Sequence, residues 1–156
     1  LGLGHLNVLY DCNKITIDGD ASLSFTEDTG AKFKAMGWHV LEACGHTQSE
    51  IDDALAAAKT ETTKPTLVVF RTVIGRGAPT KSGTSSVHGS RLGSKEATSA
   101  KAALDLPEAP FEIANDVLEA WREVGSAGRP AREAWQNRVD ELSPDFATTY
   151  ARRMSG

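Results

Sequence analysis

The chain has 156 residues, of which 40% are hydrophobic and 24% are charged, and its formal net charge is -4. These values indicate a folded, soluble domain and exclude a disordered or fibrous chain. The acidic balance, the scattered Lys and Arg residues and the scarcity of aromatic residues argue against nucleic-acid binding. No apolar run reaches the roughly 20 residues that span a bilayer, so no membrane partner is expected.

Cysteine usage and the first residue indicate the setting of the chain. Cys12 and Cys44 lie far apart without a CxxC spacing, which argues against a zinc site and predicts reduced thiols in a cytoplasmic protein. The chain opens on Leu1 and enters a predicted strand almost at once. We therefore expect it to be an excerpt from a longer polypeptide.

Strands and helices are predicted to alternate over the first half of the chain. Apolar, β-prone runs predict strands at 6–10, 38–43 and 66–74. A short amphipathic helix that Gly37 ends lies between the first two strands, and a helix that Ser49 caps lies between the last two. This alternation predicts parallel pairing and an α/β fold, a partial parallel sheet with flanking helices.

The second half is predicted to be a glycine-rich loop followed by helices. The loop, 75–93, has no periodic apolar face, and loops of this length are usually functional or disordered. A helix is predicted at about 95–104, a Pro-containing connector follows at 106–113, and two amphipathic helices come after it. Trp121 and Trp135 lie on the apolar faces of these helices, so both are predicted to be core residues.

Four polar residues follow the first apolar run. Asp11, Cys12, Asn13 and Lys14 stand where the strand is expected to end. The exits of parallel strands are common ligand sites, and an Asn oxygen with a free backbone carbonyl suits a hard cation or a phosphate complex. The alternative is an ordinary polar turn, for which Asp and Asn are equally suitable.

The glycine-rich loop and its histidine also have two interpretations. Glycines let backbone N–H groups approach a phosphate, but the loop matches neither GxGxxG nor GxxxxGK[ST], and an ordinary surface loop would have the same composition. His88 in this loop could donate to an oxyanion or shuttle protons, or it could be a surface residue. His5, His39 and His46 share no spacing and are predicted to be structural.

Longer stretches carry a family resemblance. These are "VLYDCNKITIDGDASLSFTED", "GAKFKAMGWHVLEACGH", "KPTLVVFRTVIGRGAPTKSGTSSVHGSRLG" and the segment from "APFEI" to "YARRMSG". In this order and spacing they resemble the transketolase family, in the cofactor-binding part of its N-terminal region. The resemblance implies the thiamine diphosphate-binding fold and an enzyme that moves a two-carbon ketol unit from a ketose phosphate to an aldose phosphate. It also implies a place in the pentose phosphate pathway or the Calvin cycle.

The resemblance assigns roles to five residues. Asn13 would ligate Mg²⁺ or Ca²⁺ through its side-chain oxygen, and Ile15 would do so through its main-chain carbonyl. Ile17 and Ile74 would lie beside the thiamine diphosphate and exclude water. His88 would be catalytic and cofactor-binding, since it would contact the diphosphate and the reacting oxygens of the sugar.

Some positions depart from the family pattern. Cys12 stands where family members often carry Asp or Ser, and Cys44 stands where Asp is common, although neither position is a ligand in the family. Ser85 replaces a frequent histidine, and Arg91 adds a charge near the loop. Lys81 lies in the segment that closes over the site, where its charge could attract a sugar phosphate.

The resemblance covers only part of the family's cofactor site. Residues 1–106 would be the C-terminal part of the diphosphate-binding (PP) domain, and 107–156 a helical extension toward the next domain. The family's "GDG" aspartate, its substrate-binding histidines and the next domain are not in this sequence, so the isolated chain is predicted to be inactive. Its expected partners are sugar phosphates, the remaining transketolase domains or a complementary chain, and a second copy in a homodimer.

Two alternatives remain open at the level of the sequence. The first is a non-catalytic truncated or split paralogue that acts as a cofactor-binding or interaction module. The second is another thiamine-dependent enzyme, such as a dihydroxyacetone synthase or a deoxyxylulose phosphate synthase. The "DGDASLSFTED" stretch and the loop with His88 suit transketolase better.

Overall fold

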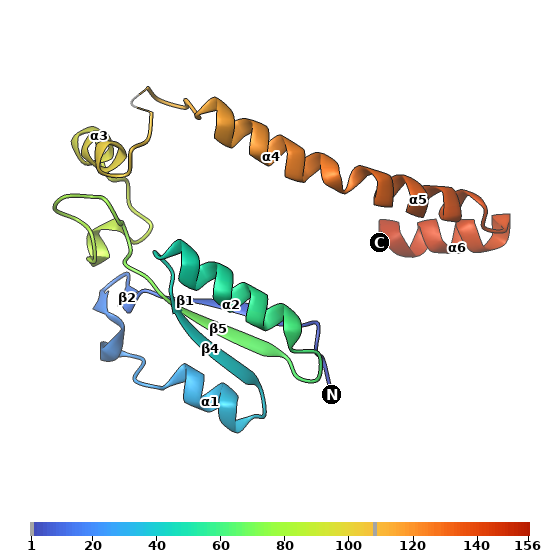
Figure 1. Cartoon of the computed structure of the whole chain (residues 1–156), viewed down its shortest axis with the longest axis horizontal. Helices are drawn as coiled ribbons and strands as arrows, with labels where there is room; N and C mark the ends of the chain where they lie inside the picture. Colours follow the sequence, from blue (N-terminus) through green and yellow to red (C-terminus); the bar gives the residue numbers. More distant parts are fainter. Residues whose placement is uncertain (1, 108) are drawn as a thin grey trace. The chain divides into compact units, whose positions relative to one another are not determined.

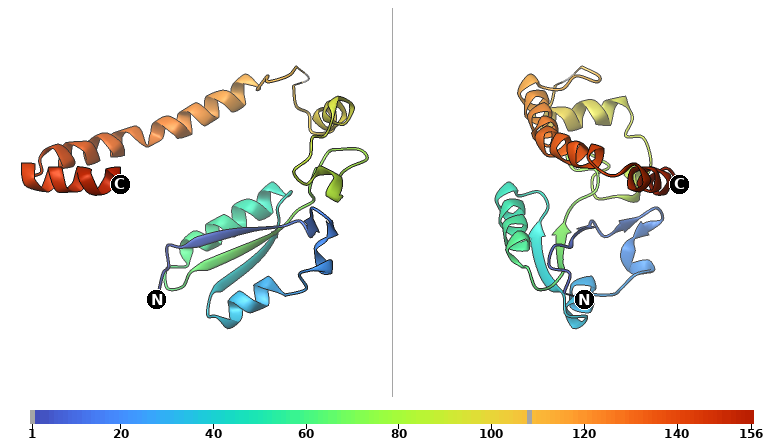
Figure 2. Two further views of the ribbon diagram at one scale, coloured as in Figure 1. Left: turned by 180° about the vertical axis from the view of Figure 1, so that it is seen from behind. Right: turned by 90° about the vertical axis from the view of Figure 1, so that its right-hand side faces the viewer.

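The computed structural model describes residues 2–107 and 109–156, which divide after Asp105 into two compact units. The first unit contains a parallel sheet of three strands in the order β1-β5-β4. These strands are β1 (Asn7–Cys12), β5 (Thr66–Arg71) and β4 (His39–Cys44), and Figures 1 and 2 show them side by side. The predicted parallel α/β arrangement is confirmed in this unit.

The central position of β5 in the sheet explains why its sequence is apolar. Thr66, Leu67, Val68 and Val69 of β5 are all buried, as expected for a strand with a neighbour on each side and a covered face. The register places both Cys12 and Cys44 opposite Arg71, so the three strands end together. β5 ends at Arg71, earlier than the predicted end at 74, because the amide of Val73 donates to a histidine ring outside the sheet.

Helices flank the sheet on opposite faces (Figure 1). α2 (Gln48–Thr60) packs Ala54 and Ala58 on Ala43 and Val68, with Leu41 and Phe70 at the margin. α1 (Thr29–Ala35) places Gly30 near Val40 and Glu42, which alternate with the α2-facing residues along β4.

The starts of these two helices differ in how they are capped. Asp28 caps α1, and its Oδ1 accepts from the amide of Ala31 at 2.8 Å. The predicted cap of α2 at Ser49 is wrong: the cap is Thr47, whose carbonyl already accepts the amide of Ile51 at 3.1 Å. Ser49 therefore lies inside the first turn.

Two short elements follow β1 that the sequence pattern does not reveal. β2 (Ile15–Thr16) and β3 (Gly19–Asp20) pair antiparallel as a small hairpin, and the 3₁₀ turn η1 (Ala21–Leu23) follows. Lys14 has a φ of 57°, which lets the chain reverse between β1 and the hairpin.

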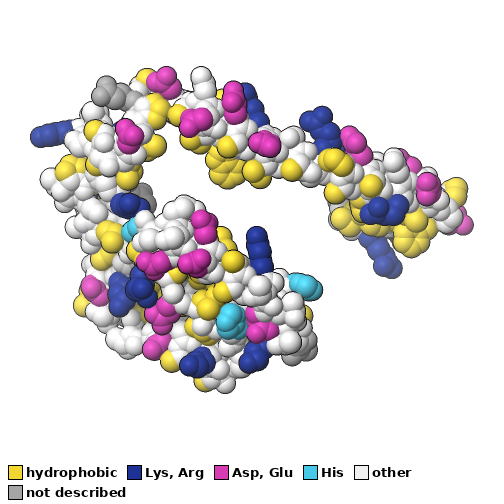
Figure 3. Space-filling view, in the orientation of Figure 1, with side chains coloured by type: hydrophobic (Ala, Val, Ile, Leu, Met, Phe, Trp, Pro, Cys, Tyr) yellow, Lys and Arg dark blue, Asp and Glu magenta, His cyan; other side chains and the backbone are white. Residues whose placement is uncertain are grey.

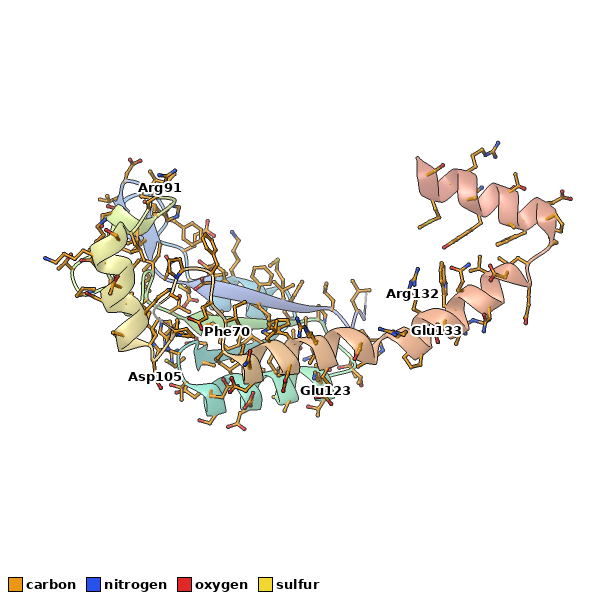
Figure 4. All side chains as sticks on the ribbon, turned by 90° about the horizontal axis from the view of Figure 1, so that it is seen from above. Phe70, Arg91, Asp105, Glu123, Arg132 and Glu133 are labelled. Atoms are coloured by element: carbon orange, nitrogen blue, oxygen red, sulfur yellow. The ribbon has the colours of Figure 1, made fainter. Side chains whose placement is uncertain are left out.

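The segment after β5 is a turn-rich connection that ends in a helix. It contains the 3₁₀ turn η2 (Ser85–Val87) and leads into α3 (Ser94–Ala103), close to the predicted helix at 95–104. Phe70 packs at the end of β5 before this segment, and Arg91 is exposed at the outer edge of the first unit (Figure 4).

The second unit consists of helices. They are α4 (Asn115–Ala127), α5 (Arg129–Asp140) and α6 (Pro144–Ser155). α6 is not predicted by the apolar periodicity, but Ser143 caps it by accepting from the amide of Phe146 at 3.4 Å, and Pro144 occupies its first turn. None of the helices in the described ranges is long and apolar enough to cross a membrane.

The prediction that two tryptophans are core residues is wrong in this unit. Trp121 is 72% exposed and Trp135 is 41% exposed. Trp135 contacts only one other ring among the described aromatic residues, Tyr150, at a centroid distance of 6.4 Å. Figure 3 shows hydrophobic side chains along one face of these helices. The periodicity correctly indicates an apolar face, but three helices of this size supply too little structure to cover it.

Candidate functional site

The carboxyl ends of the strands open onto a pocket. Because β1, β5 and β4 are parallel and end in register, the residues that leave them gather at one edge of the sheet. A pocket of about 800 Å³ lies there. It is lined by residues 10–16, 20–22 and 25–30, together with Glu42, Val69 and Arg71.

Asn13 and Ile15 form a tight turn on the wall of this pocket. The Oδ1 of Asn13 accepts a hydrogen bond from the main-chain N–H of Ile15 at 2.9 Å. The carbonyl of Lys14, between them, accepts from the amide of Ala21 at 2.9 Å, which ties the turn to the end of the hairpin. The side chains of Asn13 and Ile15 are both half-buried. The structure therefore brings these two predicted site residues together.

Charges in the pocket favour a cation. The acidic lining residues are Asp11, Asp20, Glu27, Asp28 and Glu42, and the basic ones are Lys14 and Arg71. Arg71 donates to Glu42 at 3.0 Å. Hydrogen bonds from Ser22 lower the pKa of the Asp20 carboxyl, so this group stays ionised at neutral pH. An acidic surplus with amide and carbonyl oxygens nearby suits a hard divalent ion.

The described residues alone do not complete a metal centre. Across 2–107 and 109–156, no three His, Cys, Asp or Glu side chains come close enough together to hold an ion. The oxygens of the Asn13 and Ile15 turn fit a divalent cation chemically, because each carbonyl oxygen has two lone pairs. By themselves these two oxygens would fill only part of a coordination shell.

His88 has an unsatisfied polar atom. Its Nδ1 is buried and has no hydrogen-bond partner within the described residues, although its main-chain amide donates to the carbonyl of Ser85 at 3.0 Å. Buried polar atoms are almost always paired in proteins, so a water molecule or a bound group is expected to pair with this nitrogen. An anionic oxygen would satisfy an Nδ1–H donor.

Three predicted residues lie away from the pocket lining. Ile17 is 70% exposed between the two strands of the hairpin. Ile74 is half-buried, and its carbonyl accepts the amide of Gly83 at 2.8 Å. Neither they nor His88 line the pocket. The structure therefore groups Asn13 with Ile15, and Ile74 and His88 belong to the segment after β5.

Lys81 is tied to the loop that contains it. Its Nζ donates to the carbonyl of Leu92 at 2.8 Å, and the Thr84 hydroxyl donates to the carbonyl of Lys81 at 2.7 Å. Lys81 therefore braces the loop, which is a role that the sequence did not indicate.

Sequence reasoning missed three further features near the strand ends. His46 accepts the amide of Val73 on its Nε2 at 2.7 Å, and the Thr72 hydroxyl donates to the Asp11 carboxylate. Hydrogen bonds from Thr47 and from the His46 backbone lower the pKa of the Cys44 thiol. No spacing rule predicts these contacts, because each joins segments that are distant in sequence or depends on local turn geometry.

A family model supplies the decisive comparison. The model described as transketolase, thiamine diphosphate binding domain, matches residues 1–156. The chain belongs to this transketolase family. The family predicted from the sequence and its α/β fold are therefore confirmed.

Individual transketolases agree with this assignment. The chain is 47% identical to the transketolase of Cereibacter sphaeroides over 144 residues, covering 92% of this chain and 22% of that protein. It is 42% identical to transketolase 2 of Xanthobacter flavus over 159 residues, covering 100% of this chain and 23% of that protein. The chain thus spans less than a quarter of these relatives.

Solved transketolase structures share the fold. A transketolase from Leishmania mexicana matches with a TM-score of 0.80 and 36% identity, over 90% of this chain and 21% of that chain. A Pichia stipitis transketolase in complex with sedoheptulose 7-phosphate matches with a TM-score of 0.81 and 32% identity, over 99% of this chain and 24% of that chain.

Proposed function

We propose that this chain is part of a transketolase that transfers a two-carbon ketol unit from a ketose phosphate to an aldose phosphate, in the pentose phosphate pathway or the Calvin cycle. The observation that carries the proposal is the family match along the whole chain. Thiamine diphosphate, when bound, supplies the carbanion and the electron sink for this chemistry. The residues of this chain then have to bind it, orient it and keep water away.

Asn13 and Ile15 are the proposed metal ligands of this chain. Their turn presents an amide oxygen and main-chain oxygens on the wall of an acidic pocket, which supports Mg²⁺ or Ca²⁺ as the ion. Such an ion would hold the diphosphate. The remaining ligands would come from outside this chain, including the aspartate of the family's "GDG" segment.

His88, Ile17 and Ile74 are the proposed cofactor neighbours. The buried, unpaired Nδ1 of His88 supports a role as donor to a diphosphate or substrate oxygen, and we assign it the catalytic role in this chain. Ile17 and Ile74 would cover the thiazolium side with apolar surface and exclude water. The exposure of Ile17 fits a surface that a bound group or another domain would cover.

The proposed partners follow from the same family. Sugar phosphates are the expected substrates, as in the Pichia stipitis transketolases solved with fructose 6-phosphate and sedoheptulose 7-phosphate. We assign residues 1–106 to the diphosphate-binding (PP) domain and 107–156 to an extension toward the next domain. The intact enzyme is proposed to be a cytoplasmic homodimer.

Calorimetric titration with thiamine diphosphate and Mg²⁺ tests the proposal. We expect binding by the intact protein, and no binding by the 156-residue chain unless a chain with the missing "GDG" region is added. Turnover of xylulose 5-phosphate with ribose 5-phosphate should require the intact protein. Absence of binding in every mixture would instead support the non-catalytic module. Turnover by this chain alone would contradict the proposal that it holds only part of the cofactor site.

A further inference from the structure

The exit of β5 is held by the turn that follows β4. The amide of Gly45 donates to the carbonyl of Arg71 at 2.9 Å, and the amide of Val73 donates to the Nε2 of His46 at 2.7 Å. The guanidinium of Arg76 also donates to the carbonyl of His46, at 3.4 Å. These contacts join two segments that lie more than twenty residues apart in sequence, and they set the path of the chain immediately before Ile74.

The contact between Val73 and His46 depends on the protonation state of the ring. A main-chain N–H can only donate, so Nε2 must be the unprotonated nitrogen and the imidazole must be neutral, with its proton on Nδ1. A protonated ring has donors at both nitrogens and would leave the Val73 amide without its acceptor. Among side chains, histidine is the one whose protonation state most often changes within the physiological pH range.

Little room exists for an alternative packing at this turn. A Cβ added at Gly45 would lie 2.6 Å from the Cγ2 of Thr72 and 3.3 Å from the Cβ of Phe70. Thr72 is in turn held by the hydrogen bond from its hydroxyl to Asp11. The turn after β4 is therefore fitted closely to the exit of β5.

Other charged groups lie on the segments that meet at this turn. Arg71 and Arg76 come from β5 and the segment after it, Asp11 comes from β1, and Glu50 of α2 accepts from the amide of Cys44. Carboxylates and guanidinium groups ordinarily keep their charge between about pH 5 and pH 8. The Cys44 thiol must also be considered, because its pKa is lowered and its charge can therefore change at a lower pH than that of an ordinary thiol.

We propose that His46 is a positioning residue whose neutral imidazole holds Val73, so that the chain carrying Ile74 is ordered at neutral pH and released on acidification. The consequence for the cofactor rests on the proposed function, because Ile74 is assigned there as a neighbour of thiamine diphosphate. The carbonyl of Ile74 accepts the amide of Gly83, so displacement at Val73 would pass into the glycine-rich loop.

Amide hydrogen exchange of the intact protein without cofactor tests the inference. We compare the protection factor of the Val73 amide at about pH 8 and about pH 5, with single-residue resolution and Val69 of the central strand as internal reference. Protection of Val73 in the native protein should fall about tenfold or more at the lower pH, which corresponds to losing one hydrogen bond. Protection of Val69 should stay the same.

Two variants decide whether His46 is responsible. In His46→Gln a neutral carbonyl oxygen replaces Nε2, so Val73 should be protected at both pH values. In His5→Gln, a matched change at an exposed histidine, the native pH dependence should remain. Equal protection of Val73 at both pH values in the native protein would overturn the proposal. So would a fall in Val73 protection in His46→Gln as large as in the native protein, because Cys44 is still present in that variant.

The affinity for thiamine diphosphate with Mg²⁺ gives a second readout. On acidification the dissociation constant of the native protein should rise several-fold more than that of His46→Gln. An equal rise in both would overturn the link to the cofactor. A native protein that binds no cofactor at either pH would contradict the proposed function, while the exchange measurement would still decide the role of His46.

Discussion

The side-chain oxygen of Asn13 accepts the main-chain N–H of Ile15 at 2.9 Å, directly after the last residue of β1. Since only the oxygen of the amide can accept, this hydrogen bond fixes which end of the Asn13 side chain faces the turn. The turn is therefore held by its own hydrogen bond, and the proposed metal ligands would need little further ordering to bind an ion. Preformed ligands of this kind increase affinity because the cost of ordering them is already met by folding.

Asn13→Ala should weaken thiamine diphosphate binding in the presence of Mg²⁺ by about tenfold or more, because an oxygen ligand and its support are lost together. The loss of the bond to Ile15 should lower the free energy of unfolding by only about 1 kcal/mol. Asn13→Asp, which keeps an oxygen at this position, should recover most of the affinity. Calorimetric titration of the intact protein gives the two affinities, and urea unfolding gives the change in stability.

Asn7→Ala is the matched control, because Asn7 is an exposed asparagine at the other end of the same strand. Its titration should match that of the native protein. An unchanged affinity in Asn13→Ala would show that the turn is only structural.

His88→Leu should separate stability from activity. Nδ1 of His88 is buried and has no partner among the described residues, so replacing the ring with an apolar side chain removes an unsatisfied group. The cofactor-free protein should therefore lose less than about 1 kcal/mol of stability. If His88 donates to the diphosphate or the sugar, ketol transfer should fall about a hundredfold or more. Urea unfolding and steady-state kinetics give the two quantities.

His5→Leu, at an exposed histidine, should change neither quantity. A large loss of stability in His88→Leu with proportionate loss of activity would instead place His88 among the structural residues.

The strands of the sheet were predictable because they obey local rules. The run from Thr66 to Phe70 is apolar and rich in β-branched residues, which favours a strand covered on both faces, and the sequence shows this run directly. The Asn13 and Ile15 turn is also predictable from the sequence, through the family pattern and through the polar residues that follow the apolar run of β1.

The rest of the site depends on contacts that a local pattern does not contain. The acceptor for Val73 lies on His46, in a different loop, and this pairing ends β5 early. The periodicity that identified the apolar face of Trp121 could not show that this face is open in the helical unit. Burial is a property of what packs against a helix, and sequence periodicity records only which side is apolar.

Gly45→Ala should destabilise the chain. The new Cβ would lie 2.6 Å from Thr72, whose side chain cannot turn away without losing its bond to Asp11. Overpacking of this kind costs about 1–3 kcal/mol. Gly125→Ala in α4 is the matched control, since no atom of the described residues lies within 4 Å of its added Cβ. Alanine is the better helix former, so this change should raise helix stability by about 0.5–1 kcal/mol. Urea unfolding followed by circular dichroism gives the sign of each change, and a stabilising Gly45→Ala would contradict the close fit of this turn.

Glu96 should contribute to the acid sensitivity of the first unit. The Thr80 hydroxyl donates to one carboxylate oxygen of Glu96 at 2.6 Å and the Thr80 amide to the other at 3.3 Å, and these hydrogen bonds lower the Glu96 pKa below its ordinary value of 4.5. A carboxyl whose pKa is lower in the folded state stabilises the fold above its unfolded pKa and loses this contribution as the pH falls through the folded value.

Glu96→Gln should therefore show a smaller drop in the urea midpoint between about pH 7 and pH 3 than the native chain. The drop should remain partly, because hydrogen bonds also lower the pKa values of Asp20 and Glu61. Glu119→Gln, at an exposed carboxylate of α4, should retain the native drop. An identical pH dependence in Glu96→Gln and the native chain would mean that the contact between Thr80 and Glu96 adds nothing to the stability of the loop that leads into α3.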